Sequence, residues 1–209
     1  NITTENRPMT ETFKSIKACK GLDVVIEQAP ETSVTVIADD NVQKHITTTV
    51  SGGVLTISCD SNNFMNVESK KVVVKMPVIE GIDASSGVTV TAKNTIKSNV
   101  IALKSSSGST ISVNVEADQA SCESSSGSSL TIGGKAISLE TAASSGSEIN
   151  AEKLLSNDII ASASSGSSVN VHPLVSLNAD ASSGANISYY NIPKNLNKKS
   201  SSGGSVNKQ

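Results

Sequence analysis

Aromatic side chains are almost missing from this chain of 209 residues, which has no tryptophan, two phenylalanines and two tyrosines. Enzymes that cleave polysaccharides usually hold their substrates on stacked aromatic rings, which supply a large apolar contact area. With four such rings in the whole sequence, a long aromatic-lined cleft cannot be built. An enzyme acting on polysaccharides is therefore a poor interpretation of this chain.

Arginine and histidine are also scarce. Arg7 is the only arginine, and a net charge of −2 without a basic patch argues against nucleic-acid binding. The two histidines, His45 and His172, have no second histidine or cysteine at ligand spacing, so we expect surface or capping roles and no zinc site. Nothing in the sequence indicates a cofactor, a metal or a catalytic residue.

No stretch of the sequence approaches 18 consecutive apolar residues, so we expect no transmembrane segment. The chain begins at Asn1 rather than Met and is rich in Ser, Thr and Asn, which predicts an exported protein whose leader is absent here. Cys122 falls in an apolar column and is expected in the core. Cys19 and Cys59 could pair in an exported protein, although two separate buried thiols are the preferred interpretation.

The sequence does contain one short motif, Ser-Ser-Gly, which is repeated seven times. The glycines follow one another at steps of 21, 19, 19, 20, 18 and 19 residues: Gly87, Gly108, Gly127, Gly146, Gly166, Gly184 and Gly203. A fixed period near 19 residues is typical of a solenoid.

Small or apolar residues alternate with polar residues on both sides of each glycine, which predicts two strands joined at a tight corner. The glycine supplies the positive φ that such a corner needs. The serine just before it has inward parity, so we expect a stacked serine ladder there. The alternation also predicts that Ile111→Asp is strongly destabilising and Lys104→Asp nearly neutral.

A third apolar site recurs eight or nine residues after the glycine, at Ile96, Ala117, Ala136, Leu154, Leu174 and Ile192. Three inward sites per coil predict an all-β fold, a single-stranded parallel β-helix with three sides and about 19 residues per coil. Lys198 and Lys208 occupy columns that are apolar elsewhere, and should block the last coil against end-to-end association.

The expected organisation is a tether over residues 1–12 and one β-helix domain over residues 13–209. Within that domain, residues 13–80 form irregular coils or a cap, and residues 81–209 form the regular repeats. Strands are expected at Phe13–Ala18, Leu22–Glu27, Ser33–Ala38, His45–Val50, Val54–Ser58 and Lys71–Met76, with Gly52-Gly53 as a hairpin turn.

These segments, in this order, resemble a known family. The matching residues are Phe13-Lys14-Ser15-Ile16, Leu22-Asp23-Val24-Val25-Ile26, Ser33-Val34-Thr35-Val36, Gly53-Val54-Leu55-Thr56-Ile57, Val72-Val73-Val74 and Ile82-Asp83-Ala84-Ser85-Ser86-Gly87. Together with the Ser-Ser-Gly repeats they are similar to the putative auto-transporter adhesin, head GIN domain family. The resemblance implies a right-handed, pectin-lyase-like β-helix, a periplasmic, outer-membrane-surface or extracellular location and a role in adhesion. It supplies no catalytic residues.

The function predicted from these observations is a non-enzymatic, adhesin-like protein that offers a flat polar face to a glycan, an extracellular protein surface or an envelope partner. Two alternatives stay open, a pectinase-like enzyme and a purely structural envelope protein. The outward Glu123 and Glu140, on adjacent coils and two residues out of register, could have a spacing suited to an inverting hydrolase. Solvated surface glutamates are the preferred interpretation, and the oligomeric state is left open.

Overall fold

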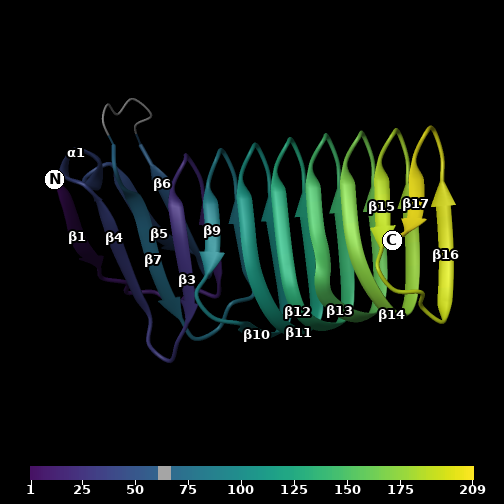
Figure 1. The fold of residues 1–209 in the computed structure, drawn as a ribbon. Coiled ribbons are helices and arrows are strands. Elements are labelled where there is room, and N and C mark those ends of the chain that lie inside the picture. Colours follow the sequence, from purple (N-terminus) through teal and green to yellow (C-terminus); the bar gives the residue numbers. More distant parts are fainter. Residues whose placement is uncertain (61–66) are drawn as a thin grey trace.

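The computed structural model describes residues 1–60 and 67–209 and is almost entirely β-structure, a solenoid of about 7 turns (Figure 1). Its elements are β1 (Ile2–Arg7), β2 (Ser15–Ala18), β3 (Asp23–Gln28), β4 (Ser33–Asp39), α1 (Asp40–Gln43), β5 (Ile46–Ser51), β6 (Val54–Cys59), β7 (Lys70–Met76), β8 (Gly81–Ala84), β9 (Thr89–Ala92), β10 (Ile96–Ser105), β11 (Thr110–Ser124), β12 (Ser129–Ala143), β13 (Glu148–Ala163), β14 (Ser168–Ala181), β15 (Asn186–Tyr189), β16 (Asn195–Ser200) and β17 (Ser205–Lys208).

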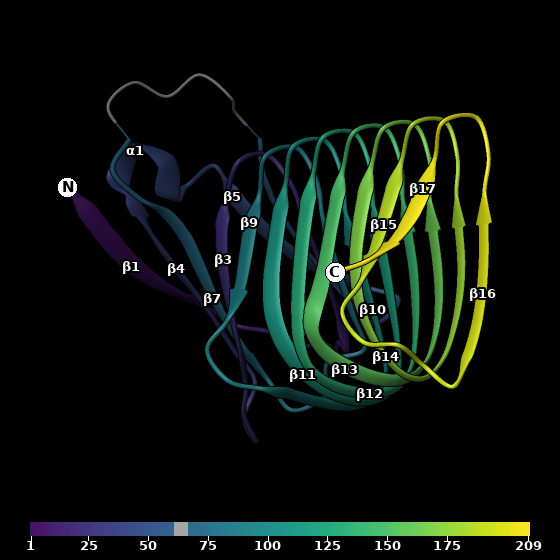
Figure 2. The same cartoon turned by 45° about the vertical axis from the view of Figure 1, so that its right-hand side comes forward.

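The regular half is a stack of parallel coils, which confirms the predicted fold class. Strands β10 to β14 pair in parallel, each with the next, and their inward columns stay in register from coil to coil. Figure 2 shows the cross-section, with two long sides that meet at a tight corner and at a rounded lower edge. Each side chain of the core therefore packs against its equivalents one coil above and one coil below.

The tight corner is a two-residue turn formed by the Ser-Ser-Gly motif. In the second repeat, Ser107 and Gly108 have φ values of 52° and 69°, and the N–H of Ser109 donates to the carbonyl of Ser106 at 3.2 Å. Two consecutive residues at positive φ define a turn of type I′, whose twist matches strands of the natural hand. The predicted glycine conformation is confirmed, and the serine before it also adopts positive φ.

The predicted serine ladder exists, but it is made by different serines. Ser107 is exposed, whereas the serine after the glycine, Ser109, is buried. Ser109 Oγ lies 2.7 Å from the carbonyl oxygen of Ala84 in the preceding coil, and equivalent bonds are made by Ser128, Ser147 and Ser167. The prediction was wrong because a residue inside a left-handed turn does not follow the alternation of the strands, although the inward positions on the two sides, Ser105 and Ser109, keep the same parity.

The lower edge is a bend within one strand rather than a separate third side, since β11 continues unbroken from Thr110 to Ser124. Register shifts fall in this bend between β12 and β13 and between β13 and β14. Leu174 and Ile192, predicted to point inward, are 39% and 68% exposed, and the neighbouring Pro173 and Pro193 are buried instead. Leu174 lies at the shift between β13 and β14, whereas Ile192 lies in the connection between β15 and β16.

The six strands predicted before residue 80 are all present within two residues of their expected bounds, and Gly52-Gly53 joins the antiparallel β5 and β6. Their order in the stack is not the order in the chain. Strand β2 lies between β6 and β8, and β3 lies between β7 and β9, so the first coil of the chain is inserted between two later ones. These pairings support the proposal that residues 13–209 form one domain.

The predicted tether over residues 1–12 is wrong for its first half. Strand β1 pairs antiparallel with β4, from Ile2 opposite Asp39 to Arg7 opposite Val34, and covers the end of the sheet. Arg7 anchors it by donating to the carbonyl of Gln43 at 3.0 Å. Among the residues the structure describes, no helix is long and apolar enough to cross a membrane.

Candidate functional site

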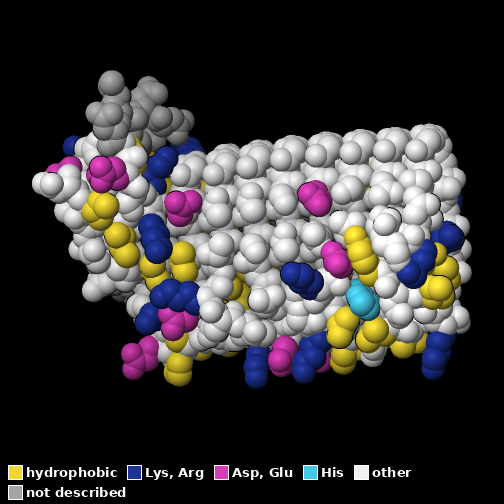
Figure 3. All heavy atoms as spheres, viewed as in Figure 1, with side chains coloured by type: hydrophobic (Ala, Val, Ile, Leu, Met, Phe, Trp, Pro, Cys, Tyr) yellow, Lys and Arg dark blue, Asp and Glu magenta, His cyan; other side chains and the backbone are white. Residues whose placement is uncertain are grey.

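One broad side of the solenoid carries almost no charge. Its two outward columns lie two and four residues after each corner glycine and are aligned by the strand register. We call this surface the neutral face, and its residues, all at least partly exposed except the buried Ser188, are Thr89, Thr91, Thr110, Ser112, Ser129, Thr131, Glu148, Asn150, Ser168, Asn170, Asn186, Ser188, Ser205 and Asn207. Glu148 is its only ionisable residue, and Figure 3 shows how few charged side chains interrupt it across β11 to β15.

The hydroxyl and amide groups of the neutral face form rows with a constant spacing, because parallel strands lie about 4.8 Å apart. At the last coils these groups bond to one another: Ser205 Oγ donates to Asn186 Oδ1 at 2.8 Å, and Asn186 Nδ2 donates to Ser188 Oγ at 3.1 Å. Thr110, Ser112 and Thr131 are exposed and have no such bond to another described residue. Their hydroxyls are therefore available to a partner.

A shallow groove of about 360 Å³ runs across the lower part of the neutral face. Its upper wall is the column of Thr91, Ser112, Thr131 and Asn150, and Asn114 and Lys153 also line it. Gly134 allows β12 to bend at the lower edge of the solenoid. Its φ is 105°, and a Cβ there would lie 2.0 Å from the carbonyl oxygen of Val115. The groove offers neutral donors and acceptors together with the ammonium group of Lys153 and the carboxylate of Glu152.

The opposite side carries alternating charge in the column four residues before the corner glycine. The register places Lys17, Asp83, Lys104 and Glu123 in sequence on neighbouring coils, and Asp180 beside Lys199 farther on. Lys104 Nζ lies 3.2 Å from Glu123 and Lys199 Nζ lies 3.4 Å from Asp180. Because these pairs are exposed, each contributes little to stability, and their main effect is to keep the coils in register.

Glu123 and Glu140, the carboxylate pair considered for hydrolysis, are on adjacent coils and two residues out of register, as predicted. They do not share a cleft: the groove lined by Glu123 does not include Glu140, which lines a separate groove with Asp158. Glu123 is also held by Lys104. The arrangement does not bring an acid and a base together around one bond.

The two histidines lie far apart in the fold. His45 Nδ1 lies 2.7 Å from Asp60 Oδ1 near the N-terminal end, and His172 aligns with Leu155 at the lower edge. Over residues 1–60 and 67–209, no three His, Cys, Asp or Glu side chains come together as a metal site would require. Cys19, Cys59 and Cys122 are free thiols, Cys59 and Cys122 being buried and Cys19 partly exposed.

A second surface, formed by exposed apolar residues of the lower edge, was not predicted from the sequence. We call Ile137, Leu155, Leu174 and Ile192 the apolar row. Leu174 and Ile192 were predicted to lie in the core because the repeat of apolar residues was extended through the bend. Pro173 precedes Leu174, and Pro193 follows Ile192. These prolines are the one signal that could have marked the change, since a proline interrupts regular strand pairing.

Comparisons with known proteins identify a matching family and several solved structures of the same fold. The model of the family "Putative auto-transporter adhesin, head GIN domain" matches residues 12–193. A putative adhesin from Bacteroides fragilis has a similar structure, with a TM-score of 0.91 at 17% identity, covering 100% of this chain and 97% of its own.

Two proteins from Parabacteroides distasonis are also similar in structure. A putative adhesin has a TM-score of 0.80 at 20% identity, and a putative lipid binding protein has a TM-score of 0.79 at 18% identity; each comparison covers 100% of this chain and 97% of the other. At these identities the likeness shows the fold alone. No curated protein matches the chain.

Proposed function

Because the chain belongs to the auto-transporter adhesin, head GIN domain family, we propose that it is an exported, non-enzymatic adhesin that binds neutral glycans through its neutral face. The observation that carries this proposal is the composition of that face, in which every residue except Glu148 is Ser, Thr or Asn. Hydroxyl and amide groups are matched to the hydroxyl groups of an uncharged sugar chain, since each can donate and accept.

The shape of the face also favours a long partner over a metabolite. A solenoid presents an extended surface on which weak contacts repeat at regular intervals. Each hydrogen bond made there replaces one to water, so its net contribution is about 0.5–1.5 kcal/mol, and useful affinity requires several at once. A glycan chain laid across several coils meets that requirement, whereas a single sugar does not.

The test is binding to a panel of soluble and immobilised polysaccharides, with release of reducing ends measured on the same panel. We expect retention on neutral glycans without cleavage. Thr110→Ala/Thr131→Ala should reduce retention at least fivefold, because both side chains are exposed on adjacent coils of the face and their hydroxyls are available to a partner. The matched control is Lys104→Ala, an exposed change on the opposite side that should leave retention unchanged.

Three results would count against the proposal. Retention that is insensitive to the two threonines would mean that another surface binds. Cleavage abolished by Glu123→Gln or Glu140→Gln would make the protein an enzyme. Absence of both retention and cleavage across the panel would leave a structural envelope protein as the better description.

A further inference from the structure

Four apolar side chains of the apolar row protrude from successive coils along the lower edge of the solenoid. Ile137, Leu155, Leu174 and Ile192 are 54%, 44%, 39% and 68% exposed. Figure 3 shows hydrophobic side chains gathered at this edge. Large apolar side chains grouped on a surface that is otherwise polar mark a site of interaction with a partner.

The row crosses successive coils at the bend of the lower edge. Ile137, Leu155 and Leu174 line one open groove of about 690 Å³, which also includes Lys97 and Lys135. The strand register is shifted at this edge, where Leu155 aligns with Lys135 on one coil and with His172 on the next, so the apolar side chains form a staggered band over successive coils. An extended, flat partner can contact the whole band at once.

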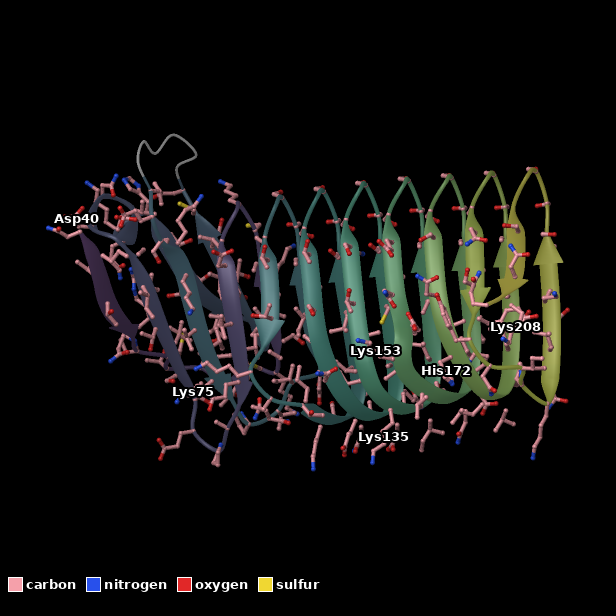
Figure 4. The ribbon with its side chains drawn as sticks, viewed as in Figure 1. Asp40, Lys75, Lys135, Lys153, His172 and Lys208 are labelled. Carbon is pink, nitrogen blue, oxygen red and sulfur yellow. The ribbon has the colours of Figure 1, made fainter. Side chains whose placement is uncertain are left out.

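Lysines stand at both ends of the row. Lys135 precedes Ile137 by two residues and Lys194 follows Ile192 by two residues, and both are exposed. Figure 4 shows Lys135 extending below the body of the solenoid. The carboxylates of this edge, Glu116 and Asp118, lie toward the N-terminal end, and Glu116 is held between Lys97 and Lys135 at 3.9 and 3.8 Å.

The side chains of the apolar row distinguish a protein partner from a lipid bilayer. Centres of protein interfaces are depleted in lysine and enriched in aromatic residues, Met and Arg, none of which occurs in the row. Aliphatic side chains flanked by lysines are typical of surfaces that rest on a bilayer, where the apolar groups enter the interface and the ammonium groups meet anionic headgroups. We propose that this edge docks on an anionic lipid bilayer, with the apolar row in the interface.

This docking is independent of the glycan proposal and compatible with it. The neutral face occupies a side of the solenoid rather than its lower edge, so a protein lying on a membrane along the apolar row leaves that face uncovered. The solenoid axis would then lie parallel to the membrane plane.

The experiment is co-sedimentation of the 209-residue chain with phosphatidylglycerol-containing vesicles and with pure phosphatidylcholine vesicles. We expect binding to the anionic vesicles that weakens with salt. Ile137→Ser/Leu174→Ser/Ile192→Ser should reduce the partition coefficient at least tenfold, and Lys135→Gln/Lys194→Gln should reduce it about threefold on anionic vesicles only.

The matched control is Val100→Ser/Ile160→Ser, which removes two side chains of similar exposure, 52% and 53%, from the side that carries the charge column. It should bind like the parent, and circular dichroism should show all variants folded. Equal losses in the control and the triple variant would overturn the proposal, as would no binding to either vesicle. A parent dimer that the triple variant turns into a monomer, without any vesicle binding, would identify the row as a contact between copies.

Discussion

Lys198 lies over the ring of Tyr189, with its Nζ 5.6 Å from the ring centroid. The two residues come from opposite sides of the last coil, because β15 pairs with the first half of β14 and β16 with the second half. Tyr189 is buried, and the contact therefore spans the end of the core. A cation above an aromatic face is stabilising by about 0.5–1 kcal/mol at such a site, and it places a charge where another coil would otherwise stack.

The first prediction concerns this end of the stack. Lys198→Leu/Lys208→Leu removes both charges that protect the free edges of β16 and β17, so the variant should self-associate as its concentration rises. Light scattering after size-exclusion chromatography would measure this. Lys199→Leu, on the same strand but aligned with the outward Asp180, is the control and should associate less. Equal behaviour of the two variants would contradict the capping role.

The second prediction tests the assignment of inward and outward positions. Ile111 is fully buried, and Ile111→Asp should lower the free energy of unfolding by more than about 4 kcal/mol, because an unpaired charge would enter the core. The alternation alone predicts that Lys104→Asp is nearly neutral. Because Lys104 lies between Asp83 and Glu123 in the structure, the substitution should lower the free energy of unfolding by about 0.5–1 kcal/mol. Lys104→Gln should be close to neutral. Equal melting temperatures for Ile111→Asp and Lys104→Asp would show that the assignment is wrong.

The third prediction uses the two left-handed residues of the corner. Ser126 has φ of 54° and Gly127 has φ of 67°, with nothing within 4 Å of a Cβ added to Gly127. Gly127→Ala should cost about 1 kcal/mol from backbone strain alone, and Ser126→Gly should stabilise by about 0.5 kcal/mol. Ser112→Gly, in an extended strand, should instead destabilise. Urea denaturation measures all three, and the same sign for both serine variants would refute the strain argument.

The fourth prediction concerns acid stability. Asp39 Oδ2 accepts the N–H groups of Ser69 at 2.8 Å and Glu68 at 2.7 Å, and these bonds lower the pKa of the Asp39 carboxyl below its usual value. A group with a lowered pKa in the folded state stabilises above its unfolded pKa of about 3.9 and loses that effect as the pH falls toward the lower value. Asp39→Asn should therefore be less stable than the parent at pH 7, with a smaller difference at pH 3. A difference that is constant over this range would exclude the linkage.

The fifth prediction concerns the cysteines. Burial raises the pKa of the Cys122 thiol to about 12, so this thiol should resist alkylation in the folded protein at pH 8. Iodoacetamide labelling followed by mass spectrometry should modify the partly exposed Cys19 first, and Cys122 only after urea is added. Three free thiols should titrate in urea without reductant. Equally fast labelling of Cys122 with and without urea would contradict its burial.

Several features of this fold could be predicted from the sequence because they depend on neighbours in the chain. The Ser-Ser-Gly period, the alternation around each glycine and the turn at Gly52-Gly53 are local, and each defines a strand or a corner. Stacking those strands in register then determines which residues share a face, so the rows of the neutral face follow from the period alone.

Other features depend on contacts between residues that are far apart in the sequence. The serine ladder is made by Ser109 rather than Ser107 because the turn itself rotates the side chains. Leu174 is exposed where the register shifts at the lower edge, and Ile192 where the connection between β15 and β16 leaves the strand pattern. The insertion of β2 and β3 between later coils, and the pairing of β1 with β4, join segments that are distant in sequence.

The sequence by itself thus determined the repeat, the corner and the composition of the neutral face, because strand period and turn geometry are properties of adjacent residues. Only the tertiary structure decided where the repeat is interrupted, that β1 covers the N-terminal end and which apolar residues reach the surface. Those outcomes depend on how each coil fits the coil beside it, and a shift of one residue in that fit exchanges the inside of the solenoid for the outside.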